Sequence, residues 1–181
     1  MAHPEQRSYC ESVKTRHPEY FQNVKVLDIG SMNVNGTNLY LFSDSEYVGV
    51  DIAPGENVSI VSKAHELEFP DGYFDTIIST ECLEHDMYWD RTLLNALRML
   101  RHGGLLLLTM ATTGRAEHGT RRSSPDMAPE LVKIGGAWAD YYRNLTPEDL
   151  HRVLEPNSAF SVWDIQINDK THDMYFMGIR H

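Results

Sequence analysis

The chain has little cysteine, no long apolar segment and fewer basic than acidic residues. Cys10 and Cys82 are its two cysteines, too few for a disulfide framework and typical of a reducing compartment. No apolar run reaches about 18 residues, and the N-terminus is polar from His3 to Arg7. We therefore expect a cytoplasmic protein with no membrane span and no secretory leader.

The shortage of basic residues also bears on partners. Lys and Arg together number 16 against 26 Asp and Glu, which gives a formal net charge of -10. Lys and Arg contacts supply most of the non-specific affinity for a nucleic-acid backbone. The composition thus argues against a nucleic-acid partner.

Two familiar phosphate-binding patterns are missing as well. A dinucleotide site requires G-x-G-x-x-G with the pyrophosphate on a helix N-terminus. Here Gly30 and Gly36 are separated by five residues, none of them glycine, and no G-x-x-x-x-G-K-[ST] loop occurs in the chain. The sequence therefore favours neither a dinucleotide site nor a P-loop.

Two segments do combine a short apolar run with a turn or an acid at its end. They read VKVLDIGSMNVNG, from Val24 to Gly36, and EYVGVDIAPG, from Glu46 to Gly55. Each run suits a buried parallel strand. The glycine-bearing turn lets the backbone approach a ligand, and the carboxylate of Asp51 is placed to accept hydrogen bonds from ribose hydroxyls. This ordered pair predicts a site for a nucleotide-like cofactor.

Strand and helix patterns alternate along the rest of the chain, as in a parallel sheet covered on both faces. Spacing of apolar residues predicts a helix over Tyr88–Arg101 that stops at Gly103 and Gly104. A second helix should begin at the N-cap Thr146. The predicted strands are Lys25–Ile29, Tyr47–Asp51, Val58–Val61, Phe74–Ser79, Leu105–Thr109, Phe160–Ile167 and Met174–Arg180, the last two forming a hairpin.

The start of the first loop, Asp28-Ile29-Gly30, resembles the first motif of the class I S-adenosylmethionine-dependent methyltransferases. The resemblance continues from Val24 to Leu154, and Glu84-His85 after the fourth strand is similar to the small type 11 branch. It implies an α/β fold, the Rossmann-like methyltransferase fold. That fold has a mostly parallel seven-stranded sheet with an antiparallel C-terminal edge hairpin and helices on both faces. The implied cofactor is S-adenosyl-L-methionine, and the product is S-adenosyl-L-homocysteine.

The resemblance also implies the residues of the cofactor site. In the family the first turn faces the methionine part of the cofactor, and the acid after the second strand holds the ribose. Two features depart from the family pattern: the first loop is long and poor in glycine, and Lys63 stands where many members carry an acid for the adenine. The implied cofactor residues are Asp28, Gly30, Ser31, Met32, Gly36, Asp51, Ile52, Ala64, His65, Thr80 and Glu81.

We expect a single domain in four parts. Residues 1–23 form a helical extension, 24–110 the cofactor-binding half, 111–145 an insertion, and 146–181 the C-terminal helix and edge hairpin. We call the insertion Ala111–Leu145 the cover segment, because it follows the fifth strand at the ligand-binding edge of the sheet. It contains the aromatic residues Trp138, Tyr141 and Tyr142, which are candidates for substrate contacts, and one predicted short helix near Pro129–Ile134.

The candidate catalytic residues follow from the chemistry of methyl transfer. The sulfonium carbon is already electrophilic, so alignment and exclusion of water are the main requirements. A hydroxyl acceptor also needs a base, and the candidates are His118, His85 and Glu117. Clustered carboxylate and amide ligands for a metal are not apparent, and no metal is expected.

The sequence thus predicts O-methylation of a hydroxyl on a sugar, glycan or other small-molecule acceptor. A small amine or a quinol-like acceptor is the alternative within enzymes. An alternative of another class is a non-catalytic methyltransferase-like subunit. Nucleic-acid methylation is disfavoured, because Ser79-Thr80-Glu81 stands where an Asn-Pro-Pro-Tyr type motif is expected.

Overall fold

The computed structural model describes residues 3–181, which form one seven-stranded sheet in the order β3-β2-β1-β4-β5-β7-β6. The five strands from β3 to β5 pair in parallel, whereas β7 pairs antiparallel with both β5 and β6. This confirms the predicted mixed sheet and its C-terminal hairpin. The strands are β1 (Lys25–Ile29), β2 (Glu46–Asp51), β3 (Ile60–Val61), β4 (Phe74–Thr80), β5 (Leu100–Ala111), β6 (Phe160–Asn168) and β7 (Asp173–Arg180).

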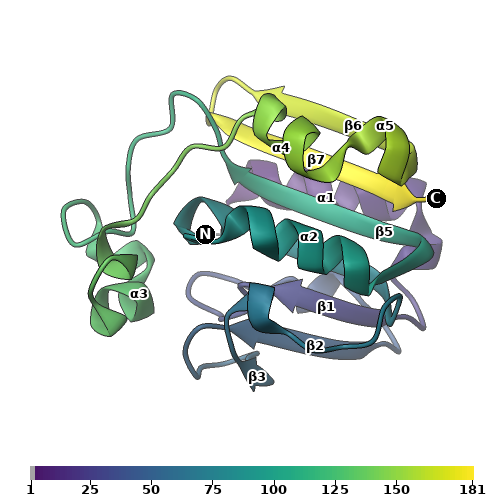
Figure 1. Ribbon diagram of the computed structural model, residues 1–181, viewed down its shortest axis with the longest axis horizontal. Helices are drawn as coiled ribbons and strands as arrows, with labels where there is room; N and C mark the ends of the chain where they lie inside the picture. The colour runs from purple at the N-terminus through teal and green to yellow at the C-terminus, as the bar shows by residue number, and fades with distance from the viewer. Residues whose placement is uncertain (1–2) are drawn as a thin grey trace.

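Helices cover both faces of the sheet. Figure 1 shows α1 (Pro4–Arg16) behind it, and α2 (Trp89–Met99), α4 (Pro147–Leu154) and α5 (Pro156–Ala159) in front. The start of α4 is the predicted one: Thr146 caps it, and Asp149 closes a reciprocal capping box. Further out, α3 (Pro129–Ile134) lies beyond the strand ends on the cover segment, where a short helix was predicted.

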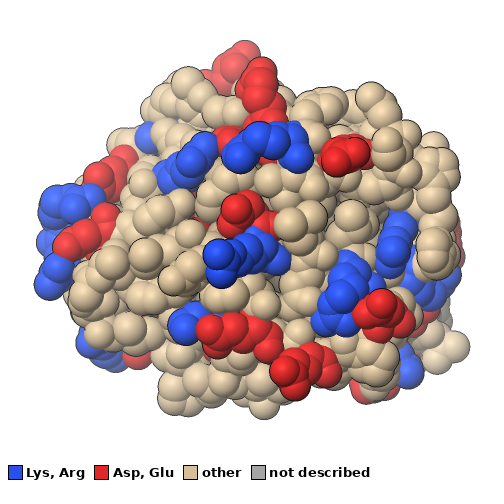
Figure 2. All heavy atoms as spheres, in the orientation of Figure 1, with Lys and Arg blue, Asp and Glu red and all other residues tan. Residues whose placement is uncertain are grey.

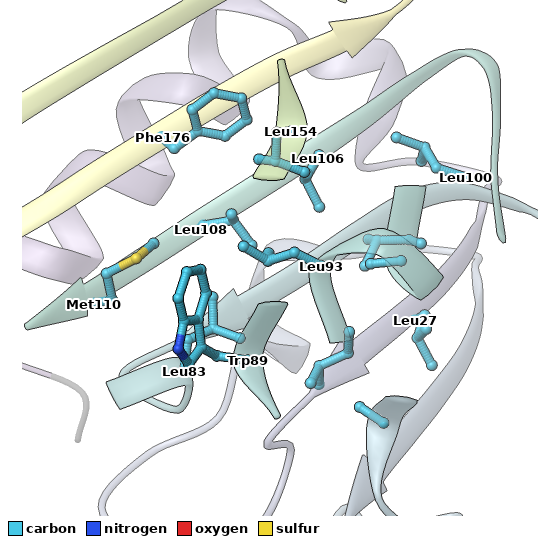
Figure 3. Packing of buried hydrophobic residues seen from close by; sticks show 14 of the residues in the cluster. Leu27, Leu83, Trp89, Leu93, Leu100, Leu106, Leu108, Met110, Leu154 and Phe176 are labelled. Atoms are coloured by element: carbon cyan, nitrogen blue, oxygen red, sulfur yellow. The ribbon is translucent and has the colours of Figure 1, made fainter. Parts of the chain in front are cut away.

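Two apolar clusters hold these layers together. The cluster under α1 includes Cys10 and Val13 of the helix and Ile78 and Leu107 of the sheet. The larger cluster lies between the sheet and α2, with Trp89 and Leu93 of the helix packed against β1, β4, β5 and β7 (Figure 3). All of these side chains are buried. Burial of a side chain of this size contributes about 1.5–3 kcal/mol, so the two clusters fix the sheet that positions the site.

The end of α2 differs from the sequence prediction. The helix ends at Met99, and Gly103 and Gly104 lie within β5, not at a helix stop. The ladder between β4 and β5 shifts register here, since Phe74 faces Leu100 but Thr76 already faces Leu105. A Cβ on Gly104 would lie 2.8 Å from the Asp75 carbonyl oxygen. The two glycines therefore lie at a β-bulge in β5. The spacing of apolar residues in the sequence does not reveal such a bulge.

The connection from β1 to β2 contains no α-helix. After Ile29 the chain runs as an irregular loop through Gly36 to a single 3-10 turn, Leu39–Leu41. The N-terminal helix α1 packs against this turn, and Leu41 is buried in the same cluster as Val13. The N-terminal helix α1 thus covers one face of the sheet and lies beside the long loop that joins β1 to β2.

The surface carries charged side chains of both signs, and the lengths of the helices can be compared with the lack of long apolar runs in the sequence. Acidic and basic side chains are interspersed over the face shown in Figure 2. Among residues 3–181, no helix has both the length and the apolar character that crossing a bilayer requires.

Candidate cofactor and acceptor site

A cleft opens at the carboxyl ends of β1, β2 and β4, the edge at which open α/β sheets bind ligands. It encloses about 1140 Å³, including the part open to solvent. The one predicted cofactor residue outside its lining is His65, whose ring packs 4.4 Å from that of Tyr88. The others all line it: Asp28, Gly30, Ser31, Met32, Gly36, Asp51, Ile52, Ala64, Thr80 and Glu81.

The turn after β1 depends on Gly30. Its φ is +78°, and a Cβ there would lie 2.5 Å from both Cβ and Sγ of Cys82. A left-handed φ suits glycine because it has no Cβ to strain. The backbone amides of Gly30 and Ser31 both donate to the Val50 carbonyl oxygen, at 2.9 and 3.1 Å. The turn is therefore held between β2 and the end of β4.

Asp28 lies buried at the base of this loop. The Nδ2 group of Asn38 donates to both of its carboxylate oxygens, at 3.1 and 3.2 Å, and the Tyr47 hydroxyl donates to Oδ2. Burial outweighs these bonds and raises the pKa of Asp28 to about 7. Asn38 and Tyr47 were not predicted as site residues, because nothing in their local sequence marks them as partners of an acid 10 and 19 residues away.

Asp51 connects the two loops of the cofactor half. Its Oδ2 accepts from the Met32 amide at 3.1 Å, and its Oδ1 accepts from the Ile52 amide at 2.8 Å. Burial raises the pKa of Asp51, and the hydrogen bonds from these amides oppose that rise. Each oxygen keeps a further lone pair for a ligand. The carboxylate thus shapes the first loop as well as facing the cleft.

Polar side chains also gather where β4 ends. Asn38 donates to the Thr80 hydroxyl at 3.0 Å, and the Thr109 hydroxyl donates to Glu81 at 2.9 Å. Glu81 adopts a φ of +51°, a strained conformation for a residue with a side chain. Burial, with the nearby charge of Glu84, raises the pKa of Glu81 to about 7. Strain and buried charge of this kind are typical of functional sites.

Two candidate catalytic histidines meet beside the cleft. The rings of His85 and His118 are 5.0 Å apart and edge-on, and Tyr142 packs against both at 5.5 and 4.9 Å. His85 lines the cleft, whereas His118 lies outside its lining, with Nδ1 bonded to the Ala116 carbonyl oxygen at 3.0 Å. Burial lowers the pKa of His85 to about 3, and His118 adds to that shift. Burial also lowers the pKa of His118, so both rings are neutral at physiological pH.

Comparison with known proteins agrees with this geometry. The sequence model described as a methyltransferase domain, of the type 11 branch, matches residues 27–108. These residues run from β1 to β5 and include the loops that form the cleft. Residues 27–108, somewhat less than half of the chain, thus match a methyltransferase domain. No curated protein matches it in sequence.

Solved structures share the fold of this chain at low sequence identity. The 1,6-didemethyltoxoflavin-N1-methyltransferase of Burkholderia thailandensis is 16% identical with a TM-score of 0.68, over 98% of this chain and 78% of that chain. The YcgJ protein of Bacillus subtilis is 15% identical with a TM-score of 0.64, over 96% of this chain and 99% of that chain. Phosphoethanolamine N-methyltransferase 2 of Haemonchus contortus is 16% identical with a TM-score of 0.65, over 96% of this chain and 52% of that chain. The first was crystallised with S-adenosylhomocysteine and the last with S-adenosyl-L-methionine.

The cover segment closes one side of the cleft. Met127–Leu131, at the start of α3, and the ring of Trp138 line it. Tyr141 instead packs against the larger apolar cluster, and Tyr142 packs against the two histidines. Met127 and Leu131 were not predicted as site residues, because a short loop helix with scattered apolar residues gives no sign of which side faces a ligand.

Glu117 lies apart from the histidines it was grouped with. Its carboxylate is outside the cleft lining, accepts from the Thr120 hydroxyl at 2.6 Å and pairs with Arg122 at 3.0 Å. These bonds lower the pKa of Glu117, Thr120 having the larger effect. In this arrangement Glu117 stabilises the turn that carries His118, and both of these residues lie outside the cleft lining.

Proposed function

We propose that the enzyme transfers the methyl group of S-adenosyl-L-methionine to a hydroxyl oxygen of a small or glycan-like acceptor. The observation that supports it most is the single cleft edge at which Asp28, Gly30, Asp51 and His85 come together. In this arrangement the first loop contacts the methionine part of the cofactor, and the carboxylate of Asp51 accepts from the ribose hydroxyls.

The adenine lies, in this proposal, against the β3 end of the cleft. Ala64 and Lys63 line this part, and Lys63 is paired with Glu66 at 3.0 Å. A lysine cannot accept a hydrogen bond from the adenine amino group. Backbone groups near Ala64 therefore take that role, as the sequence suggested.

The acceptor enters between the cover segment and the end of β4. Trp138 and Met127 supply apolar contact surface there. Of the two neighbouring histidines, His85 is the one that lines the cleft. Proton removal from a hydroxyl falls to the pair of His85 and His118, with His118 as the base. The Ala116 carbonyl, bonded to Nδ1 of His118, opposes the lowering of its pKa and leaves Nε2 to accept the proton.

A small amine is the second candidate acceptor. Two of the similar structures are named as N-methyltransferases, and Glu81 places a buried carboxylate at the edge of the cleft that suits an ammonium group. An amine must lose a proton before attack, so the same histidine pair serves both acceptors.

Two measurements test the proposal. Calorimetric titration of the purified chain should detect binding of S-adenosyl-L-methionine and of S-adenosyl-L-homocysteine, and no binding of NAD. Transfer of labelled methyl groups should then be measured with matched acceptor pairs, each a sugar or phenol and its amino analogue. Preference for the amino member throughout would replace O-methylation by N-methylation, and failure to bind the cofactor would refute the site itself.

A further inference from the structure

A carboxylate with no hydrogen-bond partner is buried directly behind the cleft. Glu84 has 0% of its surface exposed, and among residues 3–181 neither of its carboxylate oxygens accepts a hydrogen bond of ordinary geometry, although the backbone amides of Glu84 and Ala111 lie close enough to oppose the rise of its pKa. Burial raises its pKa. A buried carboxylate is costly unless a cation or hydrogen-bond donors compensate for the lost water. Glu84 is thus a buried carboxyl group for which no side chain among residues 3–181 supplies a hydrogen bond.

The two histidines supply the other ligands of a metal site. One ligand atom from each of Glu84, His85 and His118 lies within 4.8 Å of the other two, and all three side chains are buried. Nδ1 of His85 is also buried without a partner. Nδ1 of His118 faces the Ala116 carbonyl oxygen, and this is the outer bond that orients most metal-binding histidines and leaves Nε2 free to coordinate.

The backbone of the cover segment allows these rings to meet. Gly119 follows His118 with a φ of +66°, and a Cβ there would lie 2.7 Å from Cε1 of His85. Any larger residue would push the His85 ring out of the cluster. The absence of a side chain at this position is therefore required for the close approach of His85 and His118.

We propose that Glu84, His85 and His118 bind one divalent transition-metal ion, of which Zn²⁺ is the ion of choice. Two imidazoles and one carboxylate are a common ligand set for Zn²⁺ and for Fe²⁺, and three protein ligands leave positions open for a substrate. Because His85 lines the cleft, an ion bound to it would lie next to the part of the cleft proposed for the acceptor. An ion there lowers the pKa of a coordinated hydroxyl and orients it toward the methyl donor.

A second group of possible ligands lies nearby and does not need an ion. His3 pairs with Asp173 at 3.0 Å, Arg115 reaches Asp173 at 3.5 Å, and Thr109 donates to Glu81. Asp173 therefore has two cationic neighbours, although its Oδ2 makes no hydrogen bond, and Glu81 has a donor in Thr109, whereas Glu84 has neither a cationic side chain nor a side-chain donor within the described part of the chain. The comparison selects Glu84 as the carboxylate that an ion would compensate.

Metal binding does not depend on the nature of the acceptor, but its catalytic consequence rests on the proposed function. An ion on Nε2 of His118 uses the lone pair with which that residue would act as a base. The two roles of His118 are therefore alternatives, and the same experiment separates them.

The test uses the full chain, stripped with a chelator and then dialysed. Titration with Co²⁺, followed by visible absorption, should show one equivalent bound in a low-symmetry site, and Zn²⁺ should displace it. Glu84→Gln and His118→Ala should each weaken Co²⁺ binding by more than about tenfold. His102→Ala is the matched control, because that histidine is exposed and outside the cluster.

Thermal unfolding guards against variants that fail to fold. One equivalent of Zn²⁺ should raise the midpoint of the wild type and of His102→Ala, and leave that of Glu84→Gln unchanged. Absence of stoichiometric Co²⁺ binding, or equal binding by Glu84→Gln, would overturn the metal site. Cofactor titration in the presence of chelator tests the proposed function separately, because Asp28 and Asp51 lie outside the ligand set. Full turnover of the chelated wild type with loss in His118→Ala would assign His118 as the base and not as a ligand.

Discussion

Replacing Asp28 by asparagine should change how the stability of the protein depends on pH. The folded chain holds the Asp28 proton up to a pKa of about 7, compared with an ordinary value of 3.8. Between these values the folded state binds more protons than the unfolded state, so stability falls as pH rises. The whole difference corresponds to about 4 kcal/mol as an upper limit. Between about pH 5 and pH 8 the loss is about 2.5 kcal/mol.

Urea unfolding of the wild type and of Asp28→Asn at both pH values measures this effect. Asparagine keeps one acceptor oxygen for Asn38 or Tyr47 but cannot ionise, so its stability should lack the Asp28 contribution. Other groups titrate alike in both proteins and cancel in the comparison. The wild type should lose about 2.5 kcal/mol more than the variant. An equal pH dependence would mean that Asp28 is ionised normally and that burial does not control it.

The same substitution connects the loop to its cofactor. The sulfonium of S-adenosyl-L-methionine is cationic and favours the ionised form of a nearby carboxylate, whereas the thioether of the product is neutral. Affinity for the cofactor should therefore rise from pH 5 to pH 8 in the wild type, and less in Asp28→Asn. Affinity for S-adenosyl-L-homocysteine should show little of this trend. Parallel pH curves for both ligands would place Asp28 too far from the sulfonium to matter.

Other perturbations test the remaining parts of the site. Asp51→Ala should weaken cofactor binding by about 1.5–3 kcal/mol in calorimetry, with Asp51→Asn less affected; unchanged affinity in both would place the ribose elsewhere. Gly30→Ala should destabilise the fold by more than the roughly 1–2 kcal/mol that a left-handed φ costs a residue with a side chain. Adding Cys82→Gly to this variant should recover part of the lost stability in urea unfolding, and no recovery would mean that the turn moves as a unit. His118→Ala should lower turnover by about 10²–10⁴ with cofactor affinity near wild type, and nearly full turnover would end its catalytic assignment. Hydrogen exchange in residues 111–145 should slow when cofactor and acceptor bind, whereas equal protection in the free protein would make the segment static.

Most of the fold could be predicted because its signals are local. The strand β1 was predicted with the bounds that the structure has, and Thr146 marked the start of α4 by the ordinary chemistry of an N-cap. The helix stop at Gly103 and Gly104 was wrong for a non-local reason. Gly104 accommodates the close approach of the Asp75 carbonyl on the neighbouring strand, and Gly103 adopts a positive φ of +70°. No pattern within the helix carries that information.

The cofactor side of the cleft was easier to predict than the acceptor side. Loops that follow β1, β2 and β4 must meet at one edge of a parallel sheet, so the motif residues fell into one lining. The partners of Asp28 come instead from the residue before a 3-10 turn, Asn38, and from the start of β2, Tyr47, where sequence spacing implies nothing. The grouping of Glu84 with His118 likewise depends on how the cover segment folds back.

Several of the proposed cofactor, acceptor and metal contacts lie in one segment at the end of β4, from Glu81 to His85. A left-handed residue followed by a 3-10 turn replaces the first turn of a helix here. This segment places two buried carboxylates, Glu81 and Glu84, near each other, and the charge of Glu84 raises the pKa of Glu81 further. Glu81 and Cys82 face the cofactor cleft, whereas His85 lies between cleft and cover. In the proposed function and metal site, one short segment contacts the cofactor, the acceptor and the ion, so changes within it should disturb all three. Asp51 lies outside this segment and outside the proposed ligand set, so its substitution can separate cofactor binding from the other two roles.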